Sequence, residues 1–209
     1  LPDPEPLSDE VCVRIRAVAL NHLDVWVRNG LPHLKLTYPH VLGSDIAGEL
    51  DDGTPVIVSP GLSCMQCRAC LSGRDNLCSR YRILGEHVRG GYAERICVPK
   101  ANIVPRPLVR RDTGAPLLAT DCAAFVLTAM TAWQMLVGRA RVTPGETVVV
   151  IGAGSGVGVA GVQIAKLLGA RVIGTSTSDE KLVRAKELGA DETINTRRDD
   201  LVAAVKRLT

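Results

Sequence analysis

Four cysteines within fifteen positions constrain this 209-residue chain more than any other feature. The four are Cys64, Cys67, Cys70 and Cys78, with the spacing C-x2-C-x2-C-x7-C. A disulfide scaffold would be smaller and would spread its cysteines along the chain. The clustered spacing instead predicts a thiolate metal site in a reducing compartment, with Zn²⁺ as the expected ion. The remaining cysteines are scattered and carry no such signal: Cys12, Cys97 and Cys122.

Composition excludes several classes of protein. Apolar residues make up 46% and charged residues 22%, which are ordinary globular values. The net charge of +3 is spread without a basic stripe, so we expect no nucleic-acid partner. No apolar run approaches the ~18 residues of a spanning helix, so we expect no membrane partner. The acidic, proline-rich start LPDPEPLSDE is not a secretory signal, and a cytoplasmic location is expected.

The first half of the chain has the pattern of a β domain. In residues 11–20, Val11, Val13 and Ile15 would lie on one face and Arg14 and Arg16 on the other, as in a half-buried strand. Residues 46–50 and 55–59 flank Asp-Asp-Gly-Thr, which predicts a hairpin, and residues 96–99 predict another strand. We expect a small, loop-rich β-barrel over residues 1–115.

The second half alternates strands and helices. Residues 119–137 form an alanine-rich helical stretch. Strands are then expected at 146–151, 171–175 and 192–195, and helices at 157–168, 179–188 and 199–208. This β-α-β-α-β-α order is typical of the first half of a doubly wound nucleotide-binding fold. Prolines and a glycine gather in residues 106–116, so we place the second domain at residues 116–209.

A glycine-rich turn joins the first of these strands to its helix. Such a turn binds a pyrophosphate through backbone N–H groups at the start of the helix. A literal G-x-G-x-x-G at Gly156, Gly158 and Gly161 lies late, whereas the register ending on Gly158 has Ala153 and Ser155 at the earlier glycine positions. The alternative is a tight turn with no ligand. The candidate cofactor-binding residues here are Gly152, Ala153, Gly154, Ser155, Gly156, Val157 and Gly158.

The end of the second strand bears on the choice of cofactor. An NAD site usually has an acidic residue there, whereas this chain has Ser176. Small hydroxyls with Lys181 nearby suit a 2′-phosphate, so NADP(H) is favoured over NAD(H). Asp179 and Glu180 oppose this interpretation, although Thr177-x-x-Glu180 also forms a capping box. The candidates in this region are Ser176, Thr177, Ser178 and Lys181.

These pieces together resemble the medium-chain dehydrogenase/reductase superfamily, in its zinc-type alcohol dehydrogenase group. The matching motifs are Gly61-Leu-Ser-Cys64-Met-Gln-Cys67-Arg-Ala-Cys70, Leu42-Gly-Ser-Asp45, Gly90-Gly-Tyr-Ala-Glu94, Thr131-Ala-Trp133 and Thr147-Val-Val-Val-Ile-Gly-Ala-Gly-Ser-Gly-Val-Gly158. The resemblance implies a GroES-like β-barrel with a structural zinc lobe at residues 61–80, followed by a Rossmann domain. It also implies a small-molecule substrate and a homodimer or homotetramer.

The chain departs from that group where a catalytic zinc would be bound. The family's Cys, His and third ligand fall at Asn21, Ser44 and Leu127, none of which suits a zinc site with nitrogen and sulfur ligands. Asn21-His-Leu-Asp24 instead resembles the Asn-x-x-Asp loop of the metal-free, quinone-reductase-like branch. An oxygen-rich metal site from Asp24, Asp45 and His22 or His40 is the alternative. His33 and His87 are expected at the surface.

The function expected from this resemblance is NADP(H)-dependent hydride transfer to a carbonyl, a quinone or an activated alkene. The candidate catalytic residues are Asn21, His22, Asp24, Ser44, Asp45 and Thr131. Asn21 and Ser44 are expected to donate hydrogen bonds to the substrate oxygen, and His22 to contact phosphate. The alternatives are an alcohol dehydrogenase with an atypical metal site and a non-catalytic, zinc-stapled scaffold protein.

The resemblance also implies that the chain is partial. Residues 1–115 start after the family's first strands, and residues 116–209 hold only the first half of a Rossmann domain. On this interpretation these 209 residues alone are inactive.

Overall fold

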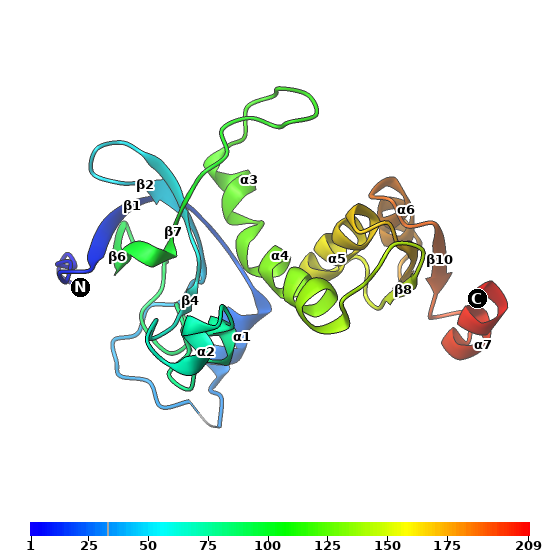
Figure 1. The fold of residues 1–209 in the computed structure, drawn as a ribbon, viewed down its shortest axis with the longest axis horizontal. Coiled ribbons are helices and arrows are strands. Elements are labelled where there is room, and N and C mark those ends of the chain that lie inside the picture. Colours follow the sequence, from blue (N-terminus) through cyan, green and yellow to red (C-terminus); the bar gives the residue numbers. More distant parts are fainter. Residues whose placement is uncertain (33) are drawn as a thin grey trace. The chain divides into compact units, whose positions relative to one another are not determined.

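The computed structural model of the chain describes residues 1–32 and 34–209, so His33 lies outside the described residues. The chain divides into two compact units, Leu1–Leu127 and Thr128–Thr209 (Figure 1).

A curled antiparallel sheet forms the frame of the first unit. Its strands run in the order β6-β1-β2-β3-β7. Their bounds are β1 Glu10–Ala19, β2 Asp45–Glu49, β3 Pro55–Val58, β6 Arg95–Pro99 and β7 Ile103–Pro105. Apolar side chains on alternate positions, such as Val13, Val58 and Val98, are buried in one core because successive residues of a strand point to opposite faces. The GroES-like β-barrel domain expected in the first part of the chain is confirmed, and its sheet has the form of a curled half-barrel.

Short elements in the loops of this unit position the candidate residues. Helix α1 (His22–Asn29) was not expected from the sequence, because only Asp24 and Val27 of its side chains are buried. Asn21 is its N-cap residue, and the Asp24 side chain in the first turn accepts the backbone N–H of Asn21 at Oδ2, at 2.7 Å. The zinc-lobe segment contains β4 (Gly61–Leu62), α2 (Arg68–Leu71), the 3₁₀ turn η1 (Asp75–Leu77) and β5 (Arg82–Ile83). A further 3₁₀ turn, η2, spans Lys100–Asn102.

A disulfide joins two of the cysteines that are scattered in the sequence. Cys12 on β1 and Cys97 on β6 are direct partners in the antiparallel ladder, with Cα atoms 4.1 Å apart. The two cysteines lie 85 positions apart in the chain. Their spacing gives no sign of the bond, because only the strand register places them opposite each other.

The helical stretch Ala119–Ala140 corrects the expectation that no apolar stretch of the chain is as long as a membrane-spanning helix. It comprises α3 (Ala119–Ala123), α4 (Val126–Trp133) and the π-helix η3 (Gln134–Ala140). It has 22 residues, and an 18-residue window within it has a mean hydropathy of 1.3, so it is long and apolar enough to cross a membrane by length and composition alone. A core helix passes the same test. Ala123 packs in the first unit's core, and Ala129 and Ala132 pack on Ala160 in the second.

A three-stranded parallel sheet, in the order β10-β9-β8, organises the second unit. The strands are β8 Thr147–Val150, β9 Arg171–Ser176 and β10 Glu192–Asn195; the helices are α5 Gly156–Leu167, α6 Asp179–Glu187 and α7 Leu201–Leu208. Val162 and Val172 are fully buried between α5 and β9. The β-α-β-α-β-α order predicted from the sequence is confirmed, as the start of a Rossmann-like domain.

Candidate functional site

The four clustered cysteines meet in the zinc lobe. Their sulfur atoms all lie within 4.8 Å of one another. The Sγ atoms of Cys64 and Cys70 are 3.9 Å apart, and those of Cys67 and Cys70 are 3.5 Å apart. A tetrahedral zinc with Zn–S distances of about 2.3 Å needs sulfurs roughly 3.8 Å apart, so the donor set fits Zn²⁺.

Backbone N–H groups prepare this lobe for thiolates. The N–H of Cys67 points to Cys64 Sγ at 3.4 Å, and the N–H of Arg80 points to Cys78 Sγ at 3.3 Å. Hydrogen bonds from the Gln66 and Cys67 backbones lower the pKa of Cys64 to about 5. Four thiolates leave no coordination position for a substrate, so this arrangement suits a structural ion.

A second cluster of polar side chains in the first unit is centred on Asp24, which is only 6% exposed. Its carboxylate accepts three hydrogen bonds: from the N–H of Asn21 at 2.7 Å, the N–H of Gly43 at 3.2 Å and the hydroxyl of Tyr92 at 2.7 Å. Gly43 has φ +98, and a Cβ there would lie 2.4 Å from the Tyr92 ring. Tyr92 lies in the Gly90–Glu94 motif, but the sequence does not indicate its role, because its contact with Asp24 spans 68 positions.

Asp45 is the buried centre of the neighbouring group. It is 1% exposed and accepts hydrogen bonds from the Asn21 side-chain amide at 2.9 Å and the Leu127 N–H at 2.7 Å. Burial raises the pKa of Asp45, and the two hydrogen bonds oppose that shift. Asn21 and Leu127 are two of the three positions where the resemblance places zinc ligands, and here both donate to one carboxylate.

The structure corrects the role expected of Ser44 and shows where His22 lies. Ser44 is fully buried and its hydroxyl donates to the carbonyl of Leu84 at 2.7 Å, so that proton is not available to a substrate oxygen. His22 is exposed and its ring centroid lies 6.1 Å from that of Trp26. Within residues 1–32 and 34–209, no cluster of three metal-ligating side chains other than the four cysteines is present, so the alternative metal site is not assembled. Thr131 belongs to the second unit.

The glycine-rich turn lies between β8 and α5. Ser155 caps α5, its side chain accepting the N–H of Gly158 at 3.1 Å. A Cβ on Gly158 would lie 2.2 Å from the Gly152 carbonyl oxygen, so only glycine fits. A Cβ on Gly161 would meet nothing closer than 3.7 Å. The close approach therefore falls in the register that ends on Gly158.

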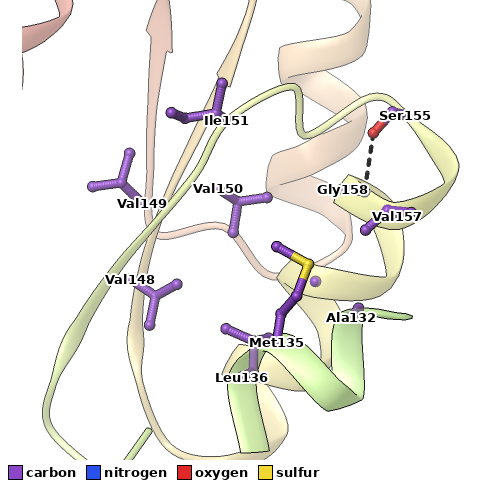
Figure 2. A pocket seen from close by; sticks show the side chains of 11 residues that line it. Ala132, Met135, Leu136, Val148, Val149, Val150, Ile151, Ser155, Val157 and Gly158 are labelled. Atoms are coloured by element: carbon purple, nitrogen blue, oxygen red, sulfur yellow. Dashed lines mark hydrogen bonds between the residues drawn. The ribbon is translucent and has the colours of Figure 1, made fainter. Parts of the chain in front are cut away.

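An apolar cavity of about 330 Å³ borders this turn. Figure 2 shows side chains of β8, including Val148 and Val150, facing Met135 and Leu136. Ser155 supplies the polar side chain of the lining, and its oxygen already accepts the Gly158 N–H. The cavity thus offers apolar contacts beside the turn, and none of the described residues that line it is charged.

Charged groups gather at the ends of β9 and β10. Asp179 at the start of α6 accepts hydrogen bonds from the Asn195 amide at 2.8 Å and from both Nη atoms of Arg198. These bonds, the Asn195 bond first, lower the pKa of Asp179. The stem of Lys181 lies over Gly154, where a Cβ would come within 2.6 Å of Lys181 Cδ. The Asp179 carboxylate is therefore paired with Arg198 and Asn195. The residue at the end of β9, where an NAD site usually has an acidic side chain, is Ser176.

A four-cysteine lobe on a half-barrel, followed by a β-α-β unit with a glycine turn, is the arrangement of the zinc-type dehydrogenase fold. Comparison with known families agrees. Residues 7–108 match the family described as alcohol dehydrogenase GroES-like domain, and residues 156–209 match the zinc-binding dehydrogenase family. The chain belongs to the medium-chain dehydrogenase/reductase superfamily.

Three similar proteins illustrate the range of this superfamily. An NAD-dependent alcohol dehydrogenase of Sulfurisphaera tokodaii is 33% identical, over 100% of this chain and 63% of its own length. An acryloyl-coenzyme A reductase of Metallosphaera sedula is 34% identical, over 86% and 54%. A solved structure of an NAD-dependent alcohol dehydrogenase is 52% identical with a TM-score of 0.93, over 100% and 62%. The chain therefore spans less than two thirds of the length of these relatives.

Proposed function

We propose that the chain is part of an NADP(H)-dependent reductase that transfers hydride to a carbonyl, a quinone or an activated alkene without a catalytic metal. The hydrogen-bonded group around Asp45 carries this proposal. Asn21 and Leu127 occupy zinc-ligand positions of the family and donate to that carboxylate. Ser44, at the other such position, donates to a backbone carbonyl. An amide, a hydroxyl and an aliphatic side chain are a poor donor set for zinc.

The chain's own residues would bind and orient the reactants. A nicotinamide cofactor, when bound, supplies the hydride. The N–H groups at the start of α5 suit its pyrophosphate. Asn21 has a second amide N–H besides the one given to Asp45, and this N–H can donate to a substrate oxygen. The exposed imidazole of His22 suits a phosphate contact.

The relatives support two substrate classes. The name acryloyl-coenzyme A reductase describes reduction of an alkene conjugated to a carbonyl, which favours the activated-alkene class. The alcohol dehydrogenase names favour alcohol oxidation as the second candidate, and they specify NAD. Ser176, in place of an acidic residue, supports our choice of NADP(H).

We also propose a homodimer or homotetramer in the cytoplasm, by analogy with the family. The thiolate cluster supports that location, and the Cys12–Cys97 disulfide counts against it because disulfides are rare in the cytosol.

The test uses the purified full-length protein. NADPH oxidation is followed with an enone and with a quinone, alcohol oxidation is followed with NADP⁺ and NAD⁺, and bound metal is counted by emission spectroscopy. We expect one zinc per chain and NADPH oxidation with an enone or a quinone. Two metals per chain with alcohol oxidation would establish the alcohol dehydrogenase instead. One zinc with no dinucleotide binding would establish a scaffold protein.

A further inference from the structure

An exposed ion pair lies beside the ends of two adjacent parallel strands. Arg198 Nη1 donates to Asp179 Oδ2 at 2.9 Å, and Arg198 Nη2 donates to Asp179 Oδ1 at 2.7 Å. The two side chains are 64% and 62% exposed. Exposed pairs of this kind contribute little to stability. Arg198 is therefore able to change partner without loss of the fold.

The strand register places this pair at the ribose end of the dinucleotide fold. Asn195 at the end of β10 is the ladder partner of Ser176, and the N–H of Thr196 donates to the Ser176 carbonyl at 3.0 Å. Arg198 follows in the same loop, its N–H bonded to the carbonyl of Asn195. In this fold the end of the second strand faces the adenosine ribose.

We propose that Arg198 is a cofactor-specificity residue that binds the 2′-phosphate of NADP(H), and that Asp179 is its internal competitor. The inference rests on the proposed function and names a residue that the sequence motifs did not indicate. A guanidinium fits a phosphate monoester with two parallel hydrogen bonds, as it now fits the carboxylate. The phosphate carries more negative charge than one carboxylate, so it displaces Asp179 from Arg198. Asp179 then keeps its bond from Asn195.

Two opposite substitutions follow from this exchange. Arg198→Ala removes the phosphate ligand, and Asp179→Asn removes the negative competitor while keeping an amide of the same shape. Arg184→Ala is the matched control, because Arg184 forms an exposed ion pair with Glu187 within α6. Dissociation constants for NADPH, NADH and 2′-phospho-ADP-ribose are measured by calorimetric titration of the full-length protein, and circular dichroism verifies the fold of each variant.

We expect Arg198→Ala to weaken NADPH and 2′-phospho-ADP-ribose by about ten- to a hundredfold, as for a lost hydrogen bond to a charged group, with NADH unchanged. Asp179→Asn should strengthen NADPH binding several-fold, and Arg184→Ala should change neither. A parent protein that prefers NADPH, with Arg198→Ala leaving that preference intact, overturns this inference alone. Weaker NADPH binding in Asp179→Asn also overturns it. A parent protein that prefers NADH overturns both this inference and the proposed cofactor.

Discussion

Replacing Tyr92 by Phe tests whether the Asp24 cluster is a built hydrogen-bond network. The change removes one of three donors to a carboxylate whose residue is 6% exposed, and leaves the N–H groups of Asn21 and Gly43 in place. A hydrogen bond to a charged group contributes about 1.5–3 kcal/mol. Tyr92 is half-buried, so we expect a loss of about 1.5–2 kcal/mol in the free energy of unfolding. The ring itself remains packed against Gly43.

Urea unfolding followed by circular dichroism measures this loss, with an unchanged slope showing that the unfolding reaction is the same. Tyr81→Phe is the matched control, because within the part of the chain that the structure describes the Tyr81 hydroxyl has no hydrogen-bond partner. A loss below about 0.5 kcal/mol, or one equal to that of Tyr81→Phe, refutes the reasoning. A double-mutant cycle with Asp24→Asn should give a coupling of about 1 kcal/mol or more.

Three further changes test the metal lobe, the turn and the buried carboxylate. Cys70→Ser should release zinc to a chromophoric chelator while Cys122→Ser, a buried free thiol outside the lobe, should not; retention of stoichiometric zinc by Cys70→Ser contradicts the site. Gly158→Ala places a Cβ 2.2 Å from a backbone oxygen and should cost about 1–3 kcal/mol and weaken NADPH binding, whereas Gly161→Ala should be tolerated; equal effects of the two on stability and titration argue against the register. Burial raises the pKa of Asp45 above its usual value of 3.8, so the free energy of unfolding should fall as the pH rises from 3.8 through the raised pKa of the folded state. Asp45→Asn should flatten that acidic part of the stability curve, and parallel curves for the two proteins in a urea series would show the reasoning to be wrong.

The zinc lobe and the glycine turn were visible in the sequence because both depend on residues close together in the chain. The cysteines of the lobe lie within fifteen positions, and their spacing alone predicts that four sulfurs meet. The β-α-β order was likewise predictable, since the hydrophobic periods of strands and helices are local properties. Helix α1 was missed because only two of its side chains are buried, which leaves little periodic signal.

Contacts between distant segments were decided by the tertiary structure. Tyr92 reaches Asp24 across 68 positions, and the Leu127 N–H reaches Asp45 across 82. The sequence indicated that the chain lacks the family's zinc ligands at these positions, but it did not indicate that a buried carboxylate joins two of them. The sequence also left the role of Asp179 open, and the structure shows that its carboxylate forms an ion pair with Arg198. Strand register and loop packing determine such contacts, and neither is encoded in the spacing of one segment alone.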